Sequence, residues 1–247
     1  MPAGAALLAV ILAGGKGTRL KPFTMTIPKP LLPLGDIPVL EVVIRQLAAN
    51  GFSRVVLTLG HMAPLFSAQF GDGRDYGLSI EYVGEFEPLG TAAPLRNLSN
   101  LPENFIVMNG DLLTDISYRL LFQDHVSQNA AATIATVSRN ETIDYGLIEM
   151  TPEGAFLDYR EKPVVSRYVS MGINVLNRRA LRAIPATGKF DMPQLILSLH
   201  SAKEKVHCHR TDCYWQDMGR FDDYTRASED FVRDSHRFLP SSNAATL

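Results

Sequence analysis

The 247-residue sequence predicts an α/β protein built on one doubly wound, mostly parallel β-sheet. Short, nearly continuous apolar runs recur along the chain, as expected for strands that are buried on both faces. A helical pattern separates the first two runs, and this order implies a right-handed crossover between parallel strands. The composition is 46% hydrophobic and does not shift along the chain, so one large domain with its own core is expected.

The first strand is expected in LLAVILAG at 7–14, and a helix follows it in PVLEVVIRQLAANG at 38–51. Gly51 supplies the C-terminal stop of this helix. We expect the domain to cover residues 1–235 and a loose polar tail to cover 236–247. Apolar residues repeat on one face of the helix at Leu40, Val43, Ile44 and Leu47. Five later runs predict further strands: RVVLTLG at 54–60, LSIEYVGE at 78–85, NFIVMNGD at 104–111, AAATIATVS at 130–138 and YVSMGINVLN at 168–177.

Charge and cysteine content exclude several classes of partner. The formal net charge is -2, from 24 basic and 26 acidic residues, so no overall field attracts nucleic acid or an anionic membrane surface. The apolar run AALLAVILA lacks a basic flank and leads directly into glycines, which argues against a signal peptide or a membrane span. Cys208 and Cys213 are too few for a disulfide framework. We therefore expect a soluble, cytoplasmic protein.

Two loops follow expected strands at the edge where α/β sheets bind ligands, AGGKGTR after the first strand and NGD after the fourth. The first loop fits neither well-known phosphate motif. A Walker A loop needs Ser or Thr after its lysine, where Gly17 follows Lys16, and a dinucleotide fingerprint needs a third glycine where Leu20 stands. The loop still offers backbone N–H donors to a phosphate, with added charge from Arg19 and Lys21. On these residues alone, a plain glycine-rich turn is an equal alternative.

Lys29 lies between Pro28 and Pro30. Prolines restrict the backbone and disfavour a helix, so we expect this lysine on a stiff, extended segment. A lysine held in this way is suited to a point-charge contact with phosphate, although a Pro-Lys-Pro segment on its own is more typical of a surface loop.

Taken together, LAGGKGTRL and PKPLLPLGDIPVLE resemble the signature of the sugar-1-phosphate nucleotidylyltransferases, which make nucleotide sugars from an NTP and a sugar phosphate. Within this family the chain is most similar to the mannose-1-phosphate and D-glycero-D-manno-heptose-1-phosphate guanylyltransferase branch. The resemblance continues over nearly the whole chain, through EPLGTA at 87–92, VMNGD at 107–111, DYGLIE at 144–149, EKP at 161–163, MGINVL at 171–176 and WQDMGR at 215–220.

The resemblance implies a three-layer α/β/α domain with a Rossmann-like, mostly parallel mixed sheet. This is the glycosyltransferase-A-like nucleotidyltransferase fold, here expected without a C-terminal β-helix domain. It also implies an enzyme of nucleotide-sugar biosynthesis that serves cell-surface polysaccharides. In the implied reaction, a sugar-1-phosphate oxygen attacks the α-phosphorus of an NTP in line and expels pyrophosphate.

The resemblance also implies the catalytic residues. Arg19 would bind the β- and γ-phosphates, and Lys29 would bridge the α-phosphate and the sugar phosphate. Asp111 and Asp217 would hold Mg²⁺, which prefers oxygen ligands and takes one or two carboxylates beside substrate phosphates. Read in isolation, Asp111 is more typical of a turn residue after Gly110, and Asp217 can be an N-cap or surface residue.

The carboxylate of Glu87 suits the edge of a guanine, which favours GTP, while uridylyl, thymidylyl and cytidylyl transfer stay open as alternatives. The methyl group of Ala93, where many relatives have glycine, is expected to narrow the entrance beside the base or sugar. The nucleotide-binding residues implied by the resemblance are Leu12, Ala13, Gly14, Gly15, Gly17, Thr18, Glu87, Pro88, Gly90 and Thr91. Those implied on the sugar side are Asn109, Gly110, Tyr145, Gly146, Glu161, Lys162, Gly172 and Asn174, with Trp215 as a pocket or core residue.

Three other interpretations fit the sequence less well. A non-catalytic nucleotide-sugar sensor is expected to have lost at least one of Arg19, Lys29, Asp111 and Asp217, and all four are present. A glycosyltransferase would need a D-x-D motif, and the spacing in GDLLTD is wrong. A zinc site in VHCHRTDC at 206–213 is disfavoured because its ligands are too close together, so a strand is the better interpretation. The segment FDDYTRASEDFVRDSHRF at 221–238 is a candidate homodimer helix.

Overall fold

A computed structural model of the chain describes residues 6–15, 17–60, 62–84 and 89–240. Its centre is a seven-stranded mixed sheet in the order β12-β8-β11-β6-β1-β4-β5. The strands β6, β1, β4 and β5 run parallel, whereas β11 is antiparallel to both of its neighbours. The strands of this sheet are β1 (Leu7–Ala13), β4 (Phe52–Leu59), β5 (Ser79–Gly84), β6 (Asn104–Asn109), β8 (Ala132–Thr142), β11 (Val164–Asn177) and β12 (Val206–Thr211). The predicted α/β class with a mostly parallel mixed sheet is therefore confirmed.

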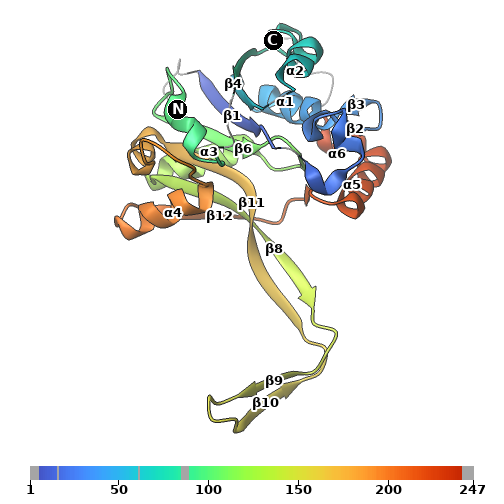
Figure 1. Cartoon of the computed structure of the whole chain (residues 1–247), viewed down its shortest axis with the longest axis vertical. Helices are drawn as coiled ribbons and strands as arrows, with labels where there is room; N and C mark the ends of the chain where they lie inside the picture. Colours follow the sequence, from blue (N-terminus) through green and yellow to red (C-terminus); the bar gives the residue numbers. More distant parts are fainter. Residues whose placement is uncertain (1–5, 16, 61, 85–88, 241–247) are drawn as a thin grey trace.

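Helices cover both faces of the sheet and complete the predicted three layers (Figure 1). On one face, α1 (Val39–Ala49), α2 (Ala63–Phe70) and α3 (Tyr118–Gln128) pack against the strands. On the other face, α4 (Met192–Ser201) packs with the 3₁₀ turns η5 (Ala93–Asn97) and η6 (Arg178–Ala183). No helix in the described part of the chain is long and apolar enough to cross a membrane.

The helix expected at 38–51 is confirmed as α1. Its buried face carries the four residues that the spacing selected, Leu40, Val43, Ile44 and Leu47, each with 0% exposure. Gly51 follows the helix with φ of 88°, the left-handed conformation that favours glycine after a helix C-terminus.

A third core cluster joins the C-terminal helices α5 (Phe221–Arg233) and α6 (Ser235–Phe238) to α1 and to the small hairpin β2 (Pro33–Leu34) and β3 (Ile37–Pro38). The sequence assigned 236–247 to a polar tail, yet Phe238 is 2% exposed, so packed structure extends at least to this residue. Residues 241–247 lie outside the described part.

The strands β8 and β11 are longer than the runs at 130–138 and 168–177 predicted. Both continue past the sheet as a two-stranded ribbon, which ends in the hairpin of β9 (Leu147–Met150) and β10 (Phe156–Arg160). The ribbon and hairpin project far from the rest of the molecule (Figure 1). The remaining elements are β7 (Leu112–Thr114), β13 (Trp215–Asp217), η1 (Thr18–Leu20), η2 (Phe23–Met25), η3 (Lys29–Leu31) and η4 (Arg74–Tyr76).

Candidate active site

The candidate site lies at the carboxyl ends of β1 and β6. The chain adds β4 and then β5 on one side of β1, and later places β6 on its other side. At such a reversal of strand order, the loops that follow neighbouring strands diverge and leave room for a ligand. The glycine-rich loop after β1 and the NGD segment after β6 therefore lie together, with Gly110 N donating to Leu12 O at 3.1 Å.

Thr24 contacts the glycine-rich loop at Gly17. The hydroxyl of Thr24 donates to Gly17 O at 2.7 Å. Gly17 has φ of 57°, and a Cβ atom there would lie 2.9 Å from Thr24 Cγ2, so only glycine fits. Arg19 follows in η1 with its guanidinium close to the backbone of Gly219. Lys16 lies outside the described residues.

Lys29 lies at the start of η3 and not on the extended segment that its neighbouring prolines predicted. Proline is tolerated in the first turn of a helix, because its missing N–H has no partner there in any case. Leu31 N and Leu32 N donate to the carbonyls of Pro28 and Lys29 at 2.8 and 3.1 Å. The Lys29 side chain is only 12% exposed, so this turn presents its ammonium from a fixed position.

Asp111 and Asp217 lie more than a hundred residues apart in the sequence and meet through two short strands. β7 and β13 pair antiparallel, with Asp217 opposite Leu112, and Met218 N lies 3.3 Å from Asp111 O. Lys29 Nζ forms an ion pair with Asp111 Oδ2 and lies 3.6 Å from Asp217 Oδ1. One ammonium group therefore lies between two carboxylates that the fold brings together.

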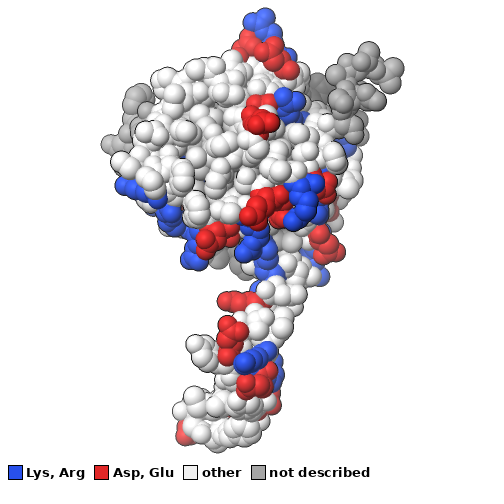
Figure 2. Space-filling model, turned by 90° about the vertical axis from the view of Figure 1, so that its right-hand side faces the viewer, with Lys and Arg blue, Asp and Glu red and all other residues white. Residues whose placement is uncertain are grey.

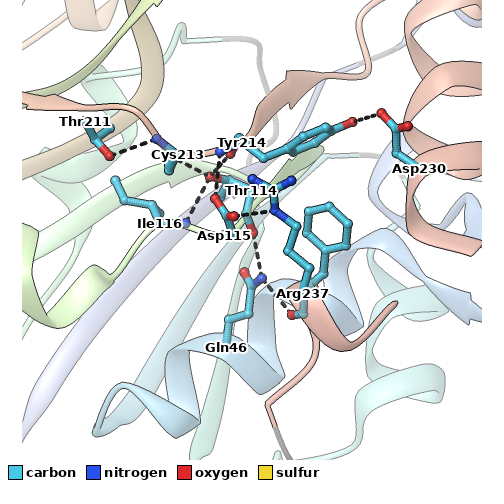
Figure 3. Close-up of polar contacts among 10 residues, drawn as sticks. Gln46, Thr114, Asp115, Ile116, Thr211, Cys213, Tyr214, Asp230 and Arg237 are labelled. Atoms are coloured by element: carbon cyan, nitrogen blue, oxygen red, sulfur yellow. Dashed lines mark hydrogen bonds and ion pairs between the residues drawn. The ribbon is translucent and has the colours of Figure 1, made fainter. Parts of the chain in front are cut away.

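A polar network behind these strands holds β13 in place (Figure 3). The Thr114 hydroxyl donates to Tyr214 O at 2.7 Å, and Tyr214 N donates to Asp115 Oδ1 at 2.7 Å. The buried amide of Gln46 donates from Nε2 to Thr114 O at 2.7 Å and to the Phe238 carbonyl at 2.8 Å. Helices α1 and α6 are thereby tied to the strand pair that carries the two carboxylates.

Burial raises the pKa of Asp217, and the nearby Asp111 carboxylate raises this pKa further, while Lys29 and Arg19 act in the opposite direction. The charged form of Asp217 is therefore disfavoured in the folded protein. A bound divalent cation would offset this cost. Two adjacent carboxylates at the edge of a cavity also match the one or two that Mg²⁺ takes beside substrate phosphates, so the residues present fit this ion.

Two cavities meet at this edge. The loop cavity has a volume of about 430 Å³ and lies between the glycine-rich loop and Asp111. Its lining residues are Leu12, Ala13, Gly14, Gly15, Gly17, Thr18, Arg19, Lys29, Pro30, Thr58, Gly90, Thr91, Asn109 and Asp111. All of the described residues that the sequence associated with the nucleotide are in this set.

The sheet cavity has a volume of about 560 Å³ and shares Leu12, Thr91 and Asn109 with the loop cavity. Asp217 lines it, and so do Asn109, Gly172 and Asn174 from the predicted sugar side. Gly172 has φ of 72°, and a Cβ atom there would lie 2.8 Å from Asn109 Nδ2. Trp215 also lines this cavity and donates from Nε1 to Met171 O at 2.8 Å, so it is a pocket residue more than a core residue.

Thr58, at the end of β4, is a site residue that the sequence did not single out. It is 1% exposed and lines the loop cavity. Within the described part of the chain, its Oγ1 is the only buried side-chain N or O atom without a hydrogen-bond partner. A buried hydroxyl of this kind is costly unless something else, such as a ligand, satisfies it. A threonine among the apolar residues of RVVLTLG was the signal available in the sequence.

Five residues predicted on the sugar side line neither cavity: Gly110, which follows β6 beside the loop after β1, and four residues of the projecting hairpin. Tyr145 and Gly146 lie between β8 and β9, and Glu161 and Lys162 lie between β10 and β11, on the projecting hairpin. Within a single chain in this conformation, they are not brought together with Lys29.

The segment expected to bind the base is described only in part, because Glu87 and Pro88 lie outside the described residues. The Thr91 hydroxyl accepts a hydrogen bond from Met192 N at 2.7 Å, which ties this segment to the start of α4. Ala93 is fully buried in the core and lines neither cavity. Its methyl group therefore does not narrow an entrance, contrary to expectation, because the residue faces the helix layer.

The first six residues of VHCHRTDC form β12, as the strand interpretation predicted. His207 Nε2 and His209 Nδ1 both contact Asp124 Oδ2, at 2.9 and 2.6 Å, while Cys208 is exposed. Among the residues that the structure describes, no group of three or more His, Cys, Asp or Glu side chains is arranged to hold a metal ion. The strand places its histidines and Cys208 on opposite faces, so the zinc interpretation gains no support.

Comparisons with known proteins indicate the same class of enzyme as the site described above. A mannose-1-phosphate guanylyltransferase of Mycobacterium tuberculosis is 34% identical over 91% of this chain, which spans 64% of that relative. A UTP–glucose-1-phosphate uridylyltransferase of Synechocystis is 30% identical over 89% of this chain, which spans 62% of it. The chain thus spans less than two thirds of these two relatives. The structure of HddC from Yersinia pseudotuberculosis superposes with a TM-score of 0.70 at 25% identity, covering 91% of this chain and 99% of that one.

The family model for nucleotidyl transferases matches residues 8–234, from β1 to the end of α5. This range includes the glycine-rich loop, Lys29 and both carboxylates. The predicted family and fold are confirmed, and the chain belongs to the nucleotidyl transferase family.

Proposed function

We propose that this protein is a sugar-1-phosphate nucleotidylyltransferase, which joins an NTP and a hexose or heptose 1-phosphate into a nucleotide sugar and releases pyrophosphate. The observation that carries the proposal is the position of Lys29 between Asp111 and Asp217, at the edge where the two cavities meet. A reaction between two anions needs charge neutralisation and alignment more than it needs a covalent nucleophile. This arrangement offers both.

The loop cavity is the proposed NTP site. The loop after β1 presents backbone groups to the nucleotide, and Arg19 binds the β- and γ-phosphates and the leaving pyrophosphate. Lys29 turns from Asp111 toward the α-phosphate and the sugar phosphate, because both anions meet at the shared edge. Asp111 and Asp217 would hold Mg²⁺, and such an ion, when bound, neutralises charge on the phosphates.

The sheet cavity is the proposed site of the sugar 1-phosphate. Asn109 and Asn174 supply polar groups, and the positive φ of Gly172 leaves room for the sugar ring. A sugar phosphate bound in this cavity would approach the α-phosphate from the side opposite to the leaving pyrophosphate, as in-line attack requires.

GTP is the proposed donor. The resemblance to guanylyltransferases and the name of the mycobacterial relative support this choice, whereas the name of the cyanobacterial relative keeps UTP as the main competitor. The product of either reaction is a nucleotide sugar, the kind of activated donor that polysaccharide synthesis consumes.

We expect pyrophosphate release with Mg²⁺, GTP and mannose 1-phosphate or a heptose 1-phosphate, because two adjoining cavities of about 430 and 560 Å³ offer separate sites for two substrates. The measurement is a matrix of four NTPs against mannose, glucose and heptose 1-phosphates, with pyrophosphate as the readout. Turnover with UTP and glucose 1-phosphate alone would change the proposed base and sugar. Activity with no combination would contradict the proposal and favour a nucleotide-sugar sensor.

Replacing Thr58 with valine is expected to raise the KM for the NTP by about 2–13-fold, the size of one lost hydrogen bond of about 0.5–1.5 kcal/mol. Valine has the same shape but lacks the hydroxyl that has no partner within the described residues. The free energy of unfolding of the substrate-free protein should stay equal or rise, because a costly buried hydroxyl is removed.

The checks for Thr58→Val are steady-state kinetics and urea unfolding. Thr133→Val serves as a control, because the Thr133 hydroxyl is also buried but already contacts His125 Nδ1 at 2.8 Å. This control should lose stability and keep the KM. A destabilised Thr58→Val protein with an unchanged KM would show that the hydroxyl has a structural role.

A further inference from the structure

The projecting ribbon and hairpin, residues 138–168, are hereafter called the arm. Pairing of β8 with β12 ends at Val137, and pairing of β11 with β6 begins at Ile173. Between these limits, β8 and β11 pair with each other, and β9 and β10 form the hairpin at the end. Figures 1 and 2 show the arm standing away from the rest of the molecule, here called the body, in two perpendicular views.

The arm carries site residues far from the cavity that needs them. Tyr159 OH donates to Glu161 Oε2 at 2.7 Å, and Gly146 packs directly against the Tyr159 ring, so the DYG and EKP segments form one cluster. Lys162 is followed, after Pro163, by the continuous strand β11, which reaches the sheet cavity at Ser170. Eight residues of extended chain at about 3.3 Å each place the two about 26 Å apart.

The surface of the arm is unusually apolar for a two-stranded element. A hairpin of two strands buries neither face, and isolated hairpins are marginally stable in water. Large apolar side chains gathered on such an element mark an interaction surface. The exposed fractions are 79% for Tyr145, 54% for Ile148, 65% for Met150, 67% for Phe156, 61% for Leu157 and 52% for Tyr159. Charged groups lie between them without forming a field of one sign (Figure 2).

The described walls of the sheet cavity are mostly apolar and carry no cation. They contain Met171, Met192, Ile196, Leu197 and Trp215, and among the described residues that line the cavity only Asp217 is charged. Sugar hydroxyls and a sugar phosphate need hydrogen-bond acceptors and a cation. Glu161 and Lys162 supply these groups, and the apolar residues beside them match the apolar part of the wall.

We propose that the arm of each chain closes the sheet cavity of a second copy of the same chain, in a reciprocal dimer. Glu161 accepts hydrogen bonds from sugar hydroxyls in the partner's cavity, and Lys162 pairs with the sugar phosphate there. This rests on the proposed function, because it assigns the sugar-binding groups of that reaction. In a two-fold symmetric dimer, each arm makes the same contacts with the other copy, so one type of contact completes both cavities.

The arm's own chain is a less suitable acceptor. β11 runs without interruption from the arm into the middle of the central sheet, where it pairs with both β8 and β6. To reach the cavity of its own chain, the paired ribbon would have to turn back on itself over a short distance and break several of these pairs. The arm can reach the sheet cavity of a second copy while all of these strand pairs stay intact.

The test is complementation between two inactive variants. Lys29→Ala disables the body, and Glu161→Gln with Lys162→Asn disables the arm. Asparagine suits position 162 because Lys162 has φ of 44°. The two variants carry different affinity tags, are co-expressed, and are purified over both tags. The heterodimer should regain about half of the wild-type turnover per dimer, because one of its two sites then combines an intact body with an intact arm.

Complementation distinguishes the dimer from closure within one chain. If each arm served its own body, every site in the mixture would carry one of the two defects and turnover would stay at the level of the variants, which would overturn the inference. Unchanged turnover of the arm variant alone would overturn it as well. Glu141→Gln is the matched control, because Glu141 is an exposed arm carboxylate that takes no part in the contacts among Gly146, Tyr159 and Glu161, and it should keep full turnover.

Sedimentation of the full chain separates this inference from the proposed function. The wild type should be a dimer, and Ile148→Ser with Met150→Ser and Phe156→Ser should be a folded monomer by circular dichroism. The control Leu120→Ser with Val126→Ser changes two exposed apolar residues of α3 and should stay dimeric. A monomeric wild type, or a dimer that the arm variant leaves intact, overturns the inference. An inactive but arm-dependent dimer would contradict only the proposed enzyme.

Discussion

Replacing Lys29 with alanine is expected to lower turnover by on the order of 10²–10³, the usual effect of losing a group that stabilises charge in a transition state. Lys29 is the cation between Asp111 and Asp217 at the edge shared by both cavities. Without it, two phosphates approach each other beside two carboxylates with one positive charge fewer. The loss should appear in kcat more than in KM, because the sugar phosphate and the α-phosphate, the two anions assigned to Lys29, come into bonding contact only during the reaction.

Thermal stability should change little in the same variant. The side chains of Lys29 and Asp111 are 12% and 18% exposed, so the pair is neither fully buried nor free of solvent. Such a pair contributes about 1 kcal/mol or less, which corresponds to about 2–4 °C in the Tm of a domain of this size. Lys205→Ala is a matched control, since Lys205 makes a single exposed hydrogen bond to Gln128. Wild-type turnover in Lys29→Ala would reject its catalytic role.

Asp111→Asn and Asp217→Asn are each expected to abolish Mg²⁺-dependent turnover. The two carboxylates are the groups that this edge offers to the ion, and an amide oxygen binds Mg²⁺ more weakly because it carries no charge. Added MgCl₂ should raise the Tm of the wild type, because a ligand that binds only the folded state stabilises it. Neither variant should show this rise. Normal Mg²⁺ dependence in both variants would contradict the assignment of the pair.

The raised pKa of Asp217 gives this prediction a defined pH dependence. A carboxyl group whose pKa is raised by folding, such as Asp217, stabilises the folded state at a pH below its ordinary pKa. This contribution is lost as the pH rises through the raised pKa. At neutral pH, charged Asp217 therefore costs stability, and Asp217→Asn without metal should be as stable as the wild type or more stable. On acidification, protons compete with Mg²⁺ at Asp217, so the Mg²⁺-dependent rise in Tm should fade already above the usual carboxyl range. Asp36→Asn, at an exposed turn, is the control and should leave both effects unchanged.

Much of the fold followed from local patterns. The apolar runs predicted the central part of each main strand, and the 3.6-residue spacing of Leu40, Val43, Ile44 and Leu47 predicted α1 and its buried face. The residues of the loop cavity were also within reach, because they stand directly after a strand, where α/β sheets bind ligands. These features depend on residues that are close in the sequence, so a local sequence pattern is enough to predict them.

Other features depend on packing between distant segments. The local rule for prolines predicted an extended Lys29, but the turn η3 uses them at its start and packs against α1. The motif around Ala93 predicted a residue at the entrance of the pocket, whereas in the folded chain Ala93 is buried in the core. Thr58 became visible only when its hydroxyl was found buried beside the loop cavity without a partner among the described residues.

The sequence by itself determined the family, the order of strands and helices, and the residue types that gather charge around a phosphate. Only the tertiary structure decided that Asp111 and Asp217 share Lys29, because the pairing of β7 with β13 joins segments more than a hundred residues apart. Only the structure decided that Glu161 and Lys162 stand on an arm away from their own cavity. The direction of the arm is set by the pairing of β8 and β11 inside the central sheet, and no local sequence pattern encodes that direction.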